Sequence, residues 1–158
     1  MIDLDELKGF LAKANMPHAD GSAPMIKETD GSRTIVFEDG PWSMHDNFFG
    51  GEPYGGRQIV LYDGEPVWLC VYYGFVAKER ESADDVYDFL REALQYPPEA
   101  MPLRGASSYK RGNFEYRHEV PEDITSFESQ EVILENGKQI YWAKLVGGLV
   151  DQRFKGSV

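Results

Sequence analysis

The sequence predicts an α+β domain in which an antiparallel β-sheet of six to eight strands carries two helices on one face. Two stretches with helical spacing of apolar residues predict the helices, and tight-turn signals between β-rich runs predict hairpins. A near repetition predicts two similar halves. IVLYDGEPVWLCVYYGFV, residues 59–76, returns near the end of the chain as VILENGKQIYWAKLVGGLV, residues 132–150.

The first helix is expected over residues 4–14. Asp3 stands before it, where a carboxylate can accept hydrogen bonds from the free amides of a first turn. The break at Asn15-Met16-Pro17 is expected to end the helix, because proline cannot continue the backbone hydrogen-bond ladder. Residues 18–32 are rich in Gly, Ser, Pro and charge, which predicts a surface connection. The apolar stripe of the helix comprises Leu4, Leu7, Phe10, Leu11 and Ala14.

The second helix is expected to begin at Ser82. Asp85 follows three residues later in a near capping-box arrangement, and Pro97-Pro98 ends the helix. Its apolar stripe comprises Val86, Phe89, Leu90, Ala93 and Leu94.

The expected hairpins turn at Asp39-Gly40-Pro41, Asp63-Gly64 and Asn136-Gly137. Each dipeptide of Asp or Asn with Gly tolerates the positive φ angles that a two-residue hairpin turn requires. Residues 113–120 alternate polar and apolar side chains, which predicts one further strand.

The two halves, residues 1–77 and 78–150, align at nearly constant spacing. Asp63 matches Asn136 at an offset of 73 residues, 136 minus 63, and Cys70 matches Ala143 at the same offset. We interpret the pattern as an internal repeat related by a pseudo-twofold axis within one sheet. Chance resemblance between hairpins and amphipathic helices is the alternative.

Strand alternation assigns faces to the two matching strands. Small residues at Cys70 and Ala143 leave room for helices, whereas Lys144, on the opposite face, requires water. The face of Leu69 and Trp142 is therefore expected to stay partly open, as a partner surface or ligand groove. The alternative is that the connection after the first helix folds over it.

Length and charge limit the function classes. The chain has 158 residues, which suits one domain, and we expect residues 1–158 to form it. Asp and Glu number 27 against 16 Lys and Arg, so the formal net charge is −11. That charge repels a phosphate backbone, and we expect no direct nucleic-acid binding.

Residue usage also indicates the compartment. The single cysteine, Cys70, rules out an internal disulfide and is expected to be a small buried apolar residue. The start, MIDLDELKGFL, is acidic where a signal peptide is basic, and no apolar run approaches the roughly 20 residues of a membrane span. We expect a cytoplasmic protein without membrane contact.

Two polar side chains stand on otherwise apolar strand faces. Asp46 has the alternation of Trp42 and Met44, and His118 has that of Tyr116. The proposed repeat makes Asp46 and His118 equivalent. They are expected to meet as a buried hydrogen-bonded pair, to line a ligand pocket, or to act in catalysis, and the residues leave these alternatives open.

Arg104 precedes the strands of the second half. Such an arginine can grip a carboxylate or a phosphate, although a solvated loop charge is the interpretation we favour. The glycines around Glu52-Pro53-Tyr54 lack the Lys and Ser or Thr of a phosphate loop. No nucleophile elbow, zinc-ligand spacing or dinucleotide fingerprint occurs, so we expect no metal and no cofactor.

The segment FFGGEPYGGRQIVLYDGEPVWLCVYYG, with MPLRG, FEYRHEV and NGKQIYWAKLVGGLV, resembles an uncharacterised bacterial and archaeal family. It is a domain of unknown function found behind Xre-type helix-turn-helix domains in transcriptional regulators. The resemblance implies an accessory, effector-sensing domain with no catalytic residues to transfer. The chain departs from the family pattern at Gln58, often acidic there, and at Val146, where a histidine often precedes Gly-Gly.

The sequence therefore predicts a non-enzymatic small-molecule-binding or sensor domain. One alternative is a homodimeric interaction domain that uses the open sheet face. Another is a small hydrolase or isomerase that uses Asp46 and His118. The candidate ligand-binding residues are Trp42, Asp46, Trp68, Tyr72, Arg104, Tyr116, His118 and Trp142.

Overall fold

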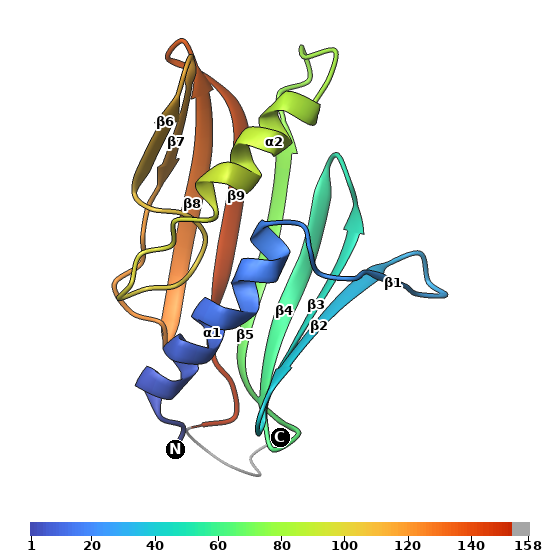
Figure 1. Cartoon of the computed structure of the whole chain (residues 1–158), viewed down its shortest axis with the longest axis vertical. Helices are drawn as coiled ribbons and strands as arrows, with labels where there is room; N and C mark the ends of the chain where they lie inside the picture. Colours follow the sequence, from blue (N-terminus) through green and yellow to red (C-terminus); the bar gives the residue numbers. More distant parts are fainter. Residues whose placement is uncertain (153–158) are drawn as a thin grey trace.

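A computed structural model describes residues 1–152, except the side chain of His18; residues 153–158 of the expected 1–158 domain lie outside the described part. The predicted α+β class and antiparallel sheet are confirmed. One sheet has the strand order β1-β2-β3-β4-β5-β9-β8-β7-β6 (Figure 1). In chain order the elements are α1 (Leu4–Ala19), β1 (Ile26–Lys27), β2 (Arg33–Asp39), β3 (Trp42–Gly50), β4 (Tyr54–Tyr62), β5 (Glu65–Val76), α2 (Asp84–Ala93), β6 (Ser108–Arg111), β7 (Phe114–His118), β8 (Ser126–Glu135) and β9 (Lys138–Leu149).

Within residues 1–152 the sheet has nine strands instead of the six to eight expected. The surface connection predicted over residues 18–32 contains β1, where Ile26 pairs with Thr34 of β2. A two-residue strand carries no alternation, so the sequence pattern could not show it.

Helix α1 continues to Ala19, so the predicted end at Asn15-Met16-Pro17 is wrong. Pro17 lies in the last turn, where its missing N–H removes one ladder bond, and the amide of Asp20 still donates to the carbonyl of Met16 at 3.0 Å. The predicted cap at Asp3 is confirmed, because its carboxylate accepts from the amides of Asp5 and Glu6 at 2.9 and 3.1 Å.

Helix α2 begins at Asp84, two residues later than expected, with Ala83 as its N-cap. The Ser82 hydroxyl accepts a hydrogen bond from the amide of Asp84 at 3.2 Å. Ser82 thus shapes the approach to the helix without being its cap. The acidic residues Asp84 and Asp85 in the first turn suit the positive end of the helix dipole.

The two predicted dipeptide turns at the ends of β4 and β8 are confirmed. Asp63 and Gly64 have φ angles of 49° and 82°, and Asn136 and Gly137 have 49° and 81°. These paired positive angles are those of a two-residue hairpin turn whose twist matches the sheet. They start β5 and β9, the two neighbouring strands in the middle of the sheet.

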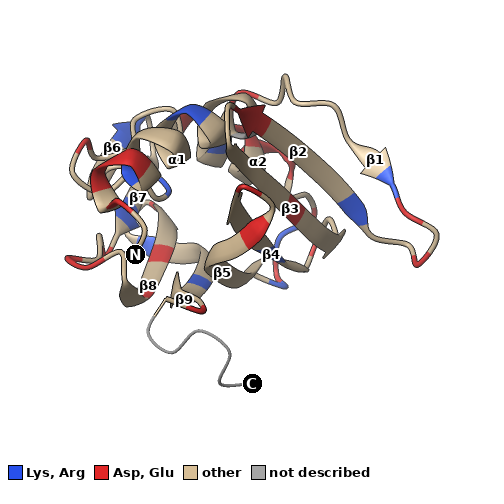
Figure 2. Ribbon diagram, turned by 90° about the horizontal axis from the view of Figure 1, so that it is seen from below, with Lys and Arg blue, Asp and Glu red and all other residues tan. Residues whose placement is uncertain are grey.

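Two apolar clusters form the core. The first joins Leu7, Phe10 and Leu11 of α1 to strands β3, β4, β5 and β9, and the second joins Phe89 and Leu90 of α2 to β5, β7, β8 and β9. Both helices lie in front of the sheet in Figure 1, and the end view in Figure 2 shows the sheet curving around them. Polar side chains lie on this same concave face, and they form the candidate site.

A buried carboxylate and arginine between the two cores

Glu131 is a fully buried carboxylate. On β8 it lies on the same face as the apolar residues Phe127 and Ile133, which is the face toward the helices. Its exposed fraction is 0%. It accepts four hydrogen bonds: two from Arg104, one from the Tyr116 hydroxyl at 2.7 Å and one from the Tyr141 hydroxyl at 2.9 Å. Such a full set of donors offsets much of the cost of burying a charge.

Arg104 reaches Glu131 from the loop between α2 and β6. Its Nε atom donates to Oε2 of Glu131 at 3.0 Å and its Nη2 atom donates to Oε1. The interpretation of Arg104 as a solvated loop charge is therefore wrong. Its φ angle of 56° is rare for a residue with a side chain, and this backbone turn aims the guanidinium inward.

The guanidinium of Arg104 uses only one of its edges within the protein. The side chain keeps 21% of its surface exposed, and in the described part of the chain its Nη1 atom donates no hydrogen bond. A planar guanidinium can bind a second acceptor along that edge. Arg104 therefore links a buried carboxylate to solvent.

Tyr54 extends the network to the start of β4. It lies opposite Gly74 of β5, and its hydroxyl forms a short hydrogen bond with the hydroxyl of Tyr141. A Cβ atom at position 74 would lie 2.8 Å from the Tyr54 hydroxyl, so glycine leaves the space that this ring crosses. Because Tyr141 donates to Glu131, the Tyr54 hydroxyl donates to Tyr141 and keeps acceptor capacity of its own.

Asp46 centres a second polar cluster on β3. It is fully buried and accepts hydrogen bonds from the Tyr72 hydroxyl at 2.5 Å and the Gln58 amide at 3.4 Å. Gln58 also donates to the side chain of Asn15 on α1 at 3.1 Å. The rings of Tyr54 and Tyr72, 6.0 Å apart, bring the two clusters together.

The electrostatics of the arginine and carboxylate keep both charged. Burial opposes the charge of Glu131, but the attraction and hydrogen bonds of Arg104 outweigh it and leave the pKa of the carboxyl below its ordinary value. Burial likewise opposes the charge of Arg104, yet Glu131 holds the pKa of the guanidinium well above its ordinary value. Burial raises the pKa of the Cys70 thiol to about 12, which makes it a poor nucleophile.

His118 is buried against the loop that carries Arg104. Its Nδ1 atom lies 2.9 Å from the Gly105 carbonyl, and its Nε2 atom lies 2.8 Å from the Ser129 hydroxyl. Burial lowers the pKa of the imidazole, so the neutral form is favoured. His118 fixes the backbone next to Arg104, and both ring nitrogens are engaged within the protein.

Asp46 and His118 do not meet. They lie on β3 and β7, which are five steps apart in the sheet, and at about 4.8 Å per step this is roughly 24 Å. Each has its own partners, Tyr72 for Asp46 and Ser129 for His118. The expected pair is therefore wrong, and the enzyme hypothesis loses the geometry it needs.

Comparison with known proteins identifies the family of this region. Residues 46–150 match the family described as Domain of unknown function (DUF5680). The chain belongs to this family. No curated protein and no solved structure matches the chain. The DUF5680 segment begins at Asp46 and contains Arg104 and Glu131, whereas α1 with Asn15 precedes it.

Four of the five aromatic residues predicted for the site occupy three environments. Trp42 stacks on Phe10 of α1 and Trp68 stacks on Phe127, both inside the first cluster. Tyr116 is a fully buried donor to Glu131. Trp142 lies on the opposite, outer face of the sheet, with Lys144 5.9 Å from its ring centroid. The structure thus brings together Arg104 and Tyr116 in one network, and Asp46 and Tyr72 in the other.

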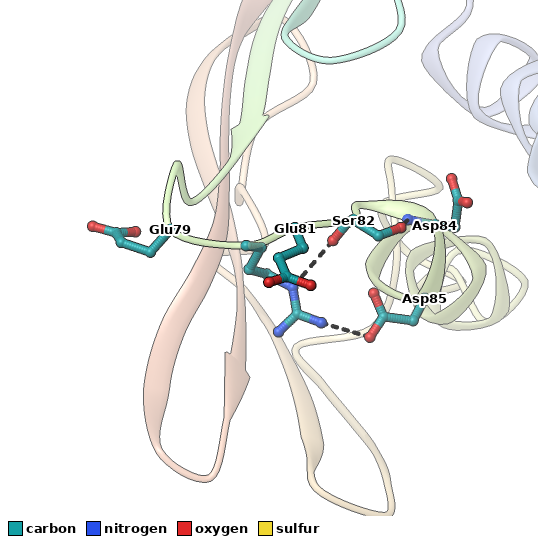
Figure 3. A pocket seen from close by; sticks show the side chains of 6 residues that line it. Glu79, Glu81, Ser82, Asp84 and Asp85 are labelled. Carbon is teal, nitrogen blue, oxygen red and sulfur yellow. Dashed lines mark hydrogen bonds and ion pairs between the residues drawn. The ribbon is translucent and has the colours of Figure 1, made fainter.

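Two surface hollows lie apart from this network. One, of about 570 Å³, is lined by residues 79–82 with Asp84 and Asp85 (Figure 3). The only cation in this lining, Arg80, pairs with Asp85 and Glu135. The other, of about 510 Å³, follows β7 and β8 and includes His118, whose ring is already engaged. In the second hollow Arg117 donates only its Nε atom, to Glu115, but its side chain is 59% exposed, whereas Arg104 is held against a buried carboxylate.

Within residues 1–152, no three His, Cys, Asp or Glu side chains gather closely enough to hold a metal ion. The described helices are too short or too polar to cross a bilayer.

Sequence reasoning missed Glu131, Tyr54 and Tyr141. The signal for Glu131 was present, because it has the strand alternation of Phe127 and Ile133 and so must point into the core. Gln58 stands in the corresponding place on β4, opposite Cys70, as Glu131 stands opposite Ala143. Applying the offset of 73 residues to Gln58 would have found Glu131.

Proposed function

We propose that this DUF5680 domain is a non-enzymatic sensor that binds a small organic carboxylate at the solvent-facing edge of Arg104. The proposal rests on the second edge of the Arg104 guanidinium, which binds no group of the described protein. Glu131 holds one edge of Arg104, while Nη1 has no acceptor in the described part of the chain and the side chain remains 21% exposed.

The arrangement favours a carboxylate for geometric reasons. A guanidinium presents two parallel donors to a carboxylate, and the Glu131 contact already fixes its plane and orientation. The guanidinium therefore loses little freedom when a ligand binds, which favours affinity. Because Glu131 neutralises its charge, the contact selects by geometry more than by net attraction.

Half-buried aromatic rings favour an apolar body on the ligand. Tyr54 and Tyr72 lie side by side next to the network, each partly exposed on the concave face. Rings of this kind contact an apolar or aromatic group while their hydroxyls stay hydrogen-bonded. An aromatic acid would thus use both the guanidinium and the rings, whereas acetate would use the guanidinium alone.

We further propose that binding serves regulation in the cytoplasm. The support is the resemblance to domains found behind Xre-type helix-turn-helix modules, together with the net charge of −11 that opposes direct DNA contact. A sensor of this type acts by changing the stability of the segment that carries its ligand contact. Here that segment is the loop of Arg104, which His118 and Tyr116 tie to the sheet.

The internal repeat remains part of this proposal, and the strand register supports it. Tyr54 pairs with Gly74 and Phe127 pairs with Gly147, and each ring lies over its glycine. Both residue pairs are related by the offset of 73 residues. A duplicated ancestor would explain why both pairs place an aromatic ring over a glycine on the neighbouring strand.

The test is ligand-dependent thermal stability, with acetate, benzoate and inorganic phosphate as probes. A ligand that binds only the folded state raises the melting temperature with concentration. Benzoate should raise it most, acetate less, and phosphate least. Failure of all three probes to raise the melting temperature would contradict the proposal.

Two matched double variants each replace both partners of one ion pair with glutamine. R104Q/E131Q removes the guanidinium without leaving a buried charge unpaired, and it should abolish the benzoate response. R111Q/E92Q removes the surface pair in which Nη1 of Arg111 lies 2.7 Å from Glu92, and it should keep that response. An R104Q/E131Q variant that folds and still responds like the parent would place the ligand elsewhere.

A further inference from the structure

The outer face of the sheet exposes large apolar side chains. The exposed fractions are 44% for Val71, 50% for Tyr73 and 56% for Val146, all on the two central strands. Both helices lie on the other face, and the sheet curves away from this one (Figure 2). Grouped apolar exposure on a sheet face marks a surface that contacts another protein.

Charge on this face differs from the charge of the whole chain. The chain carries −11, yet the outward positions of β4, β5, β9 and β8 hold two cations, Arg57 and Lys144, and one anion, Glu128. The strong self-repulsion of the molecule is therefore absent from this patch. A second copy of the chain can approach here without bringing like charges together.

One cross-strand row has a self-complementary order. Arg57 of β4 pairs in register with Val71 of β5, Val71 with Val146 of β9, and Val146 with Glu128 of β8. The row thus reads cation, apolar, apolar, anion across four strands. In the described part of the chain, neither Arg57 nor Glu128 takes part in an ion pair.

We infer that the chain forms an isologous homodimer through this outer face, with the twofold axis parallel to the strands and between β5 and β9. The operation reverses the order of the row, so Arg57 of each protomer faces Glu128 of its partner. Val71 then packs against Val146 at the centre. The inference is independent of the proposed carboxylate site at Arg104, which lies on the concave face.

The charge pattern favours a twofold axis parallel to the strands over one perpendicular to them. An axis across the strands would keep the order of the row and place Arg57 opposite the partner's Arg57. Packing of aligned sheets at about 30° turns each sheet by about 15° from the axis. Arg57 and Glu128 lie roughly 7 Å from the axis, so their opposed backbones shift by about 4 Å, which both side chains can span.

Neighbouring rows suit the same axis. Tyr73 pairs with Lys144, and Phe75 pairs with Trp142, across the β5–β9 boundary. After the rotation, the Lys144 ammonium faces the partner's Tyr73 ring and each Trp142 faces the partner's Phe75. Cation–π and aromatic contacts would therefore replace solvent around the central valines.

The experiment measures self-association of the full chain by sedimentation velocity, up to roughly 1 mM so that weak dimers are detected. The parent should dimerise, and R57E or E128R should each raise the dissociation constant by at least about tenfold, because each opposes like charges. The charge-exchanged R57E/E128R variant should recover most of the loss, as expected of a directly opposed pair.

The control variants move charge elsewhere. R33E, on β2 far from the central strands, and E122R, in the loop before β8, change exposed charges outside the patch and should leave the dissociation constant unchanged. R57Q and E128Q provide milder substitutions should a charge reversal prevent folding. A parent that stays monomeric, a dimer indifferent to both single reversals, or an R57E/E128R variant without recovery would overturn the inference.

Discussion

The two ends of the β5–β9 pair have the same construction but different contents. At one end the Phe127 ring lies over Gly147 and stacks on Trp68, with centroids 5.8 Å apart. At the other end the Tyr54 ring lies over Gly74 and bonds to the Tyr141 hydroxyl, which leads to Glu131 and Arg104. The first end is a dry aromatic core, and the second is a polar network that reaches solvent.

The two ends differ in how their central side chains are stabilised. Trp68 needs only one acceptor, the Ile124 carbonyl at 3.0 Å, and the rest of its surface is apolar contact. Glu131 needs four donors from three residues. Apolar side chains of similar volume would stabilise that position at least as well, so the ion pair points to a binding role.

The largest expected effect comes from removing one partner of the buried pair. R104A should lower the free energy of unfolding by about 3–5 kcal/mol, because Glu131 is left buried without its cation. R111A, which breaks the surface pair with Glu92, should cost no more than about 1 kcal/mol. Urea unfolding measures both, and equal costs would show that the polar end is not structurally coupled to its charge.

The two glycines under the aromatic rings should differ in cost. G147A places a Cβ atom 2.1 Å from the Leu69 carbonyl oxygen, which is backbone, and should cost about 3 kcal/mol. G74A meets the Tyr54 hydroxyl at 2.8 Å, which can shift, and the Cβ atom of Ala143 at 2.9 Å, so a smaller cost of about 2 kcal/mol is expected. The reverse order in urea unfolding would contradict the close packing described at the dry end.

Replacing Phe127 with tyrosine and Tyr54 with phenylalanine compares the tolerance of the two ends for a hydroxyl group. F127Y puts a hydroxyl into apolar surroundings beside Trp68 and should cost about 1–3 kcal/mol. Y54F removes one hydrogen bond to Tyr141, which keeps its bond to Glu131, and should cost about 1 kcal/mol. Chemical denaturation of both variants is the measurement. An F127Y variant as stable as the parent would mean that the new hydroxyl finds a hydrogen-bond partner beside Trp68, which would contradict the description of this end as dry.

The smallest effect concerns pH. Burial lowers the pKa of His118 below 6.5, so the unfolded chain takes up a proton at this position before the folded chain does. Stability therefore falls as the pH drops below 6.5, by at most about 1.4 kcal/mol per pH unit from this residue. H118Q should reduce that slope, and H45Q, which removes an exposed histidine, is the control. A slope unchanged in H118Q would argue against a buried neutral imidazole.

Much of the scaffold could be predicted because local signals determine it. Asp63-Gly64 and Asn136-Gly137 have the φ angles that their residue types favour, and these turns set the register of both hairpins. Strand alternation correctly placed Asp46 and His118 on the face of their apolar neighbours, where both are buried. Alternation shows which face a residue occupies, but not which residue it meets.

The site could not be predicted because it depends on distant pairing. Arg104 and Glu131 are joined only when an irregular loop with a positive φ angle turns one toward the other. The sequence of that loop carries no periodicity, so the inward direction of Arg104 had no signal. Asp46 and His118 fit the proposed repeat, but equivalent positions in two halves can lie far apart, and here they do.

The most direct test of the central claim is an NMR titration of ¹⁵N-labelled protein with benzoate, following two side-chain signals. The Arg104 Nε–H reports on the polar end and the Trp68 indole N–H reports on the dry end. We predict a saturable shift of the Arg104 signal while the Trp68 signal stays in place. A shift of Trp68 without Arg104, or no saturable shift of either, would contradict it.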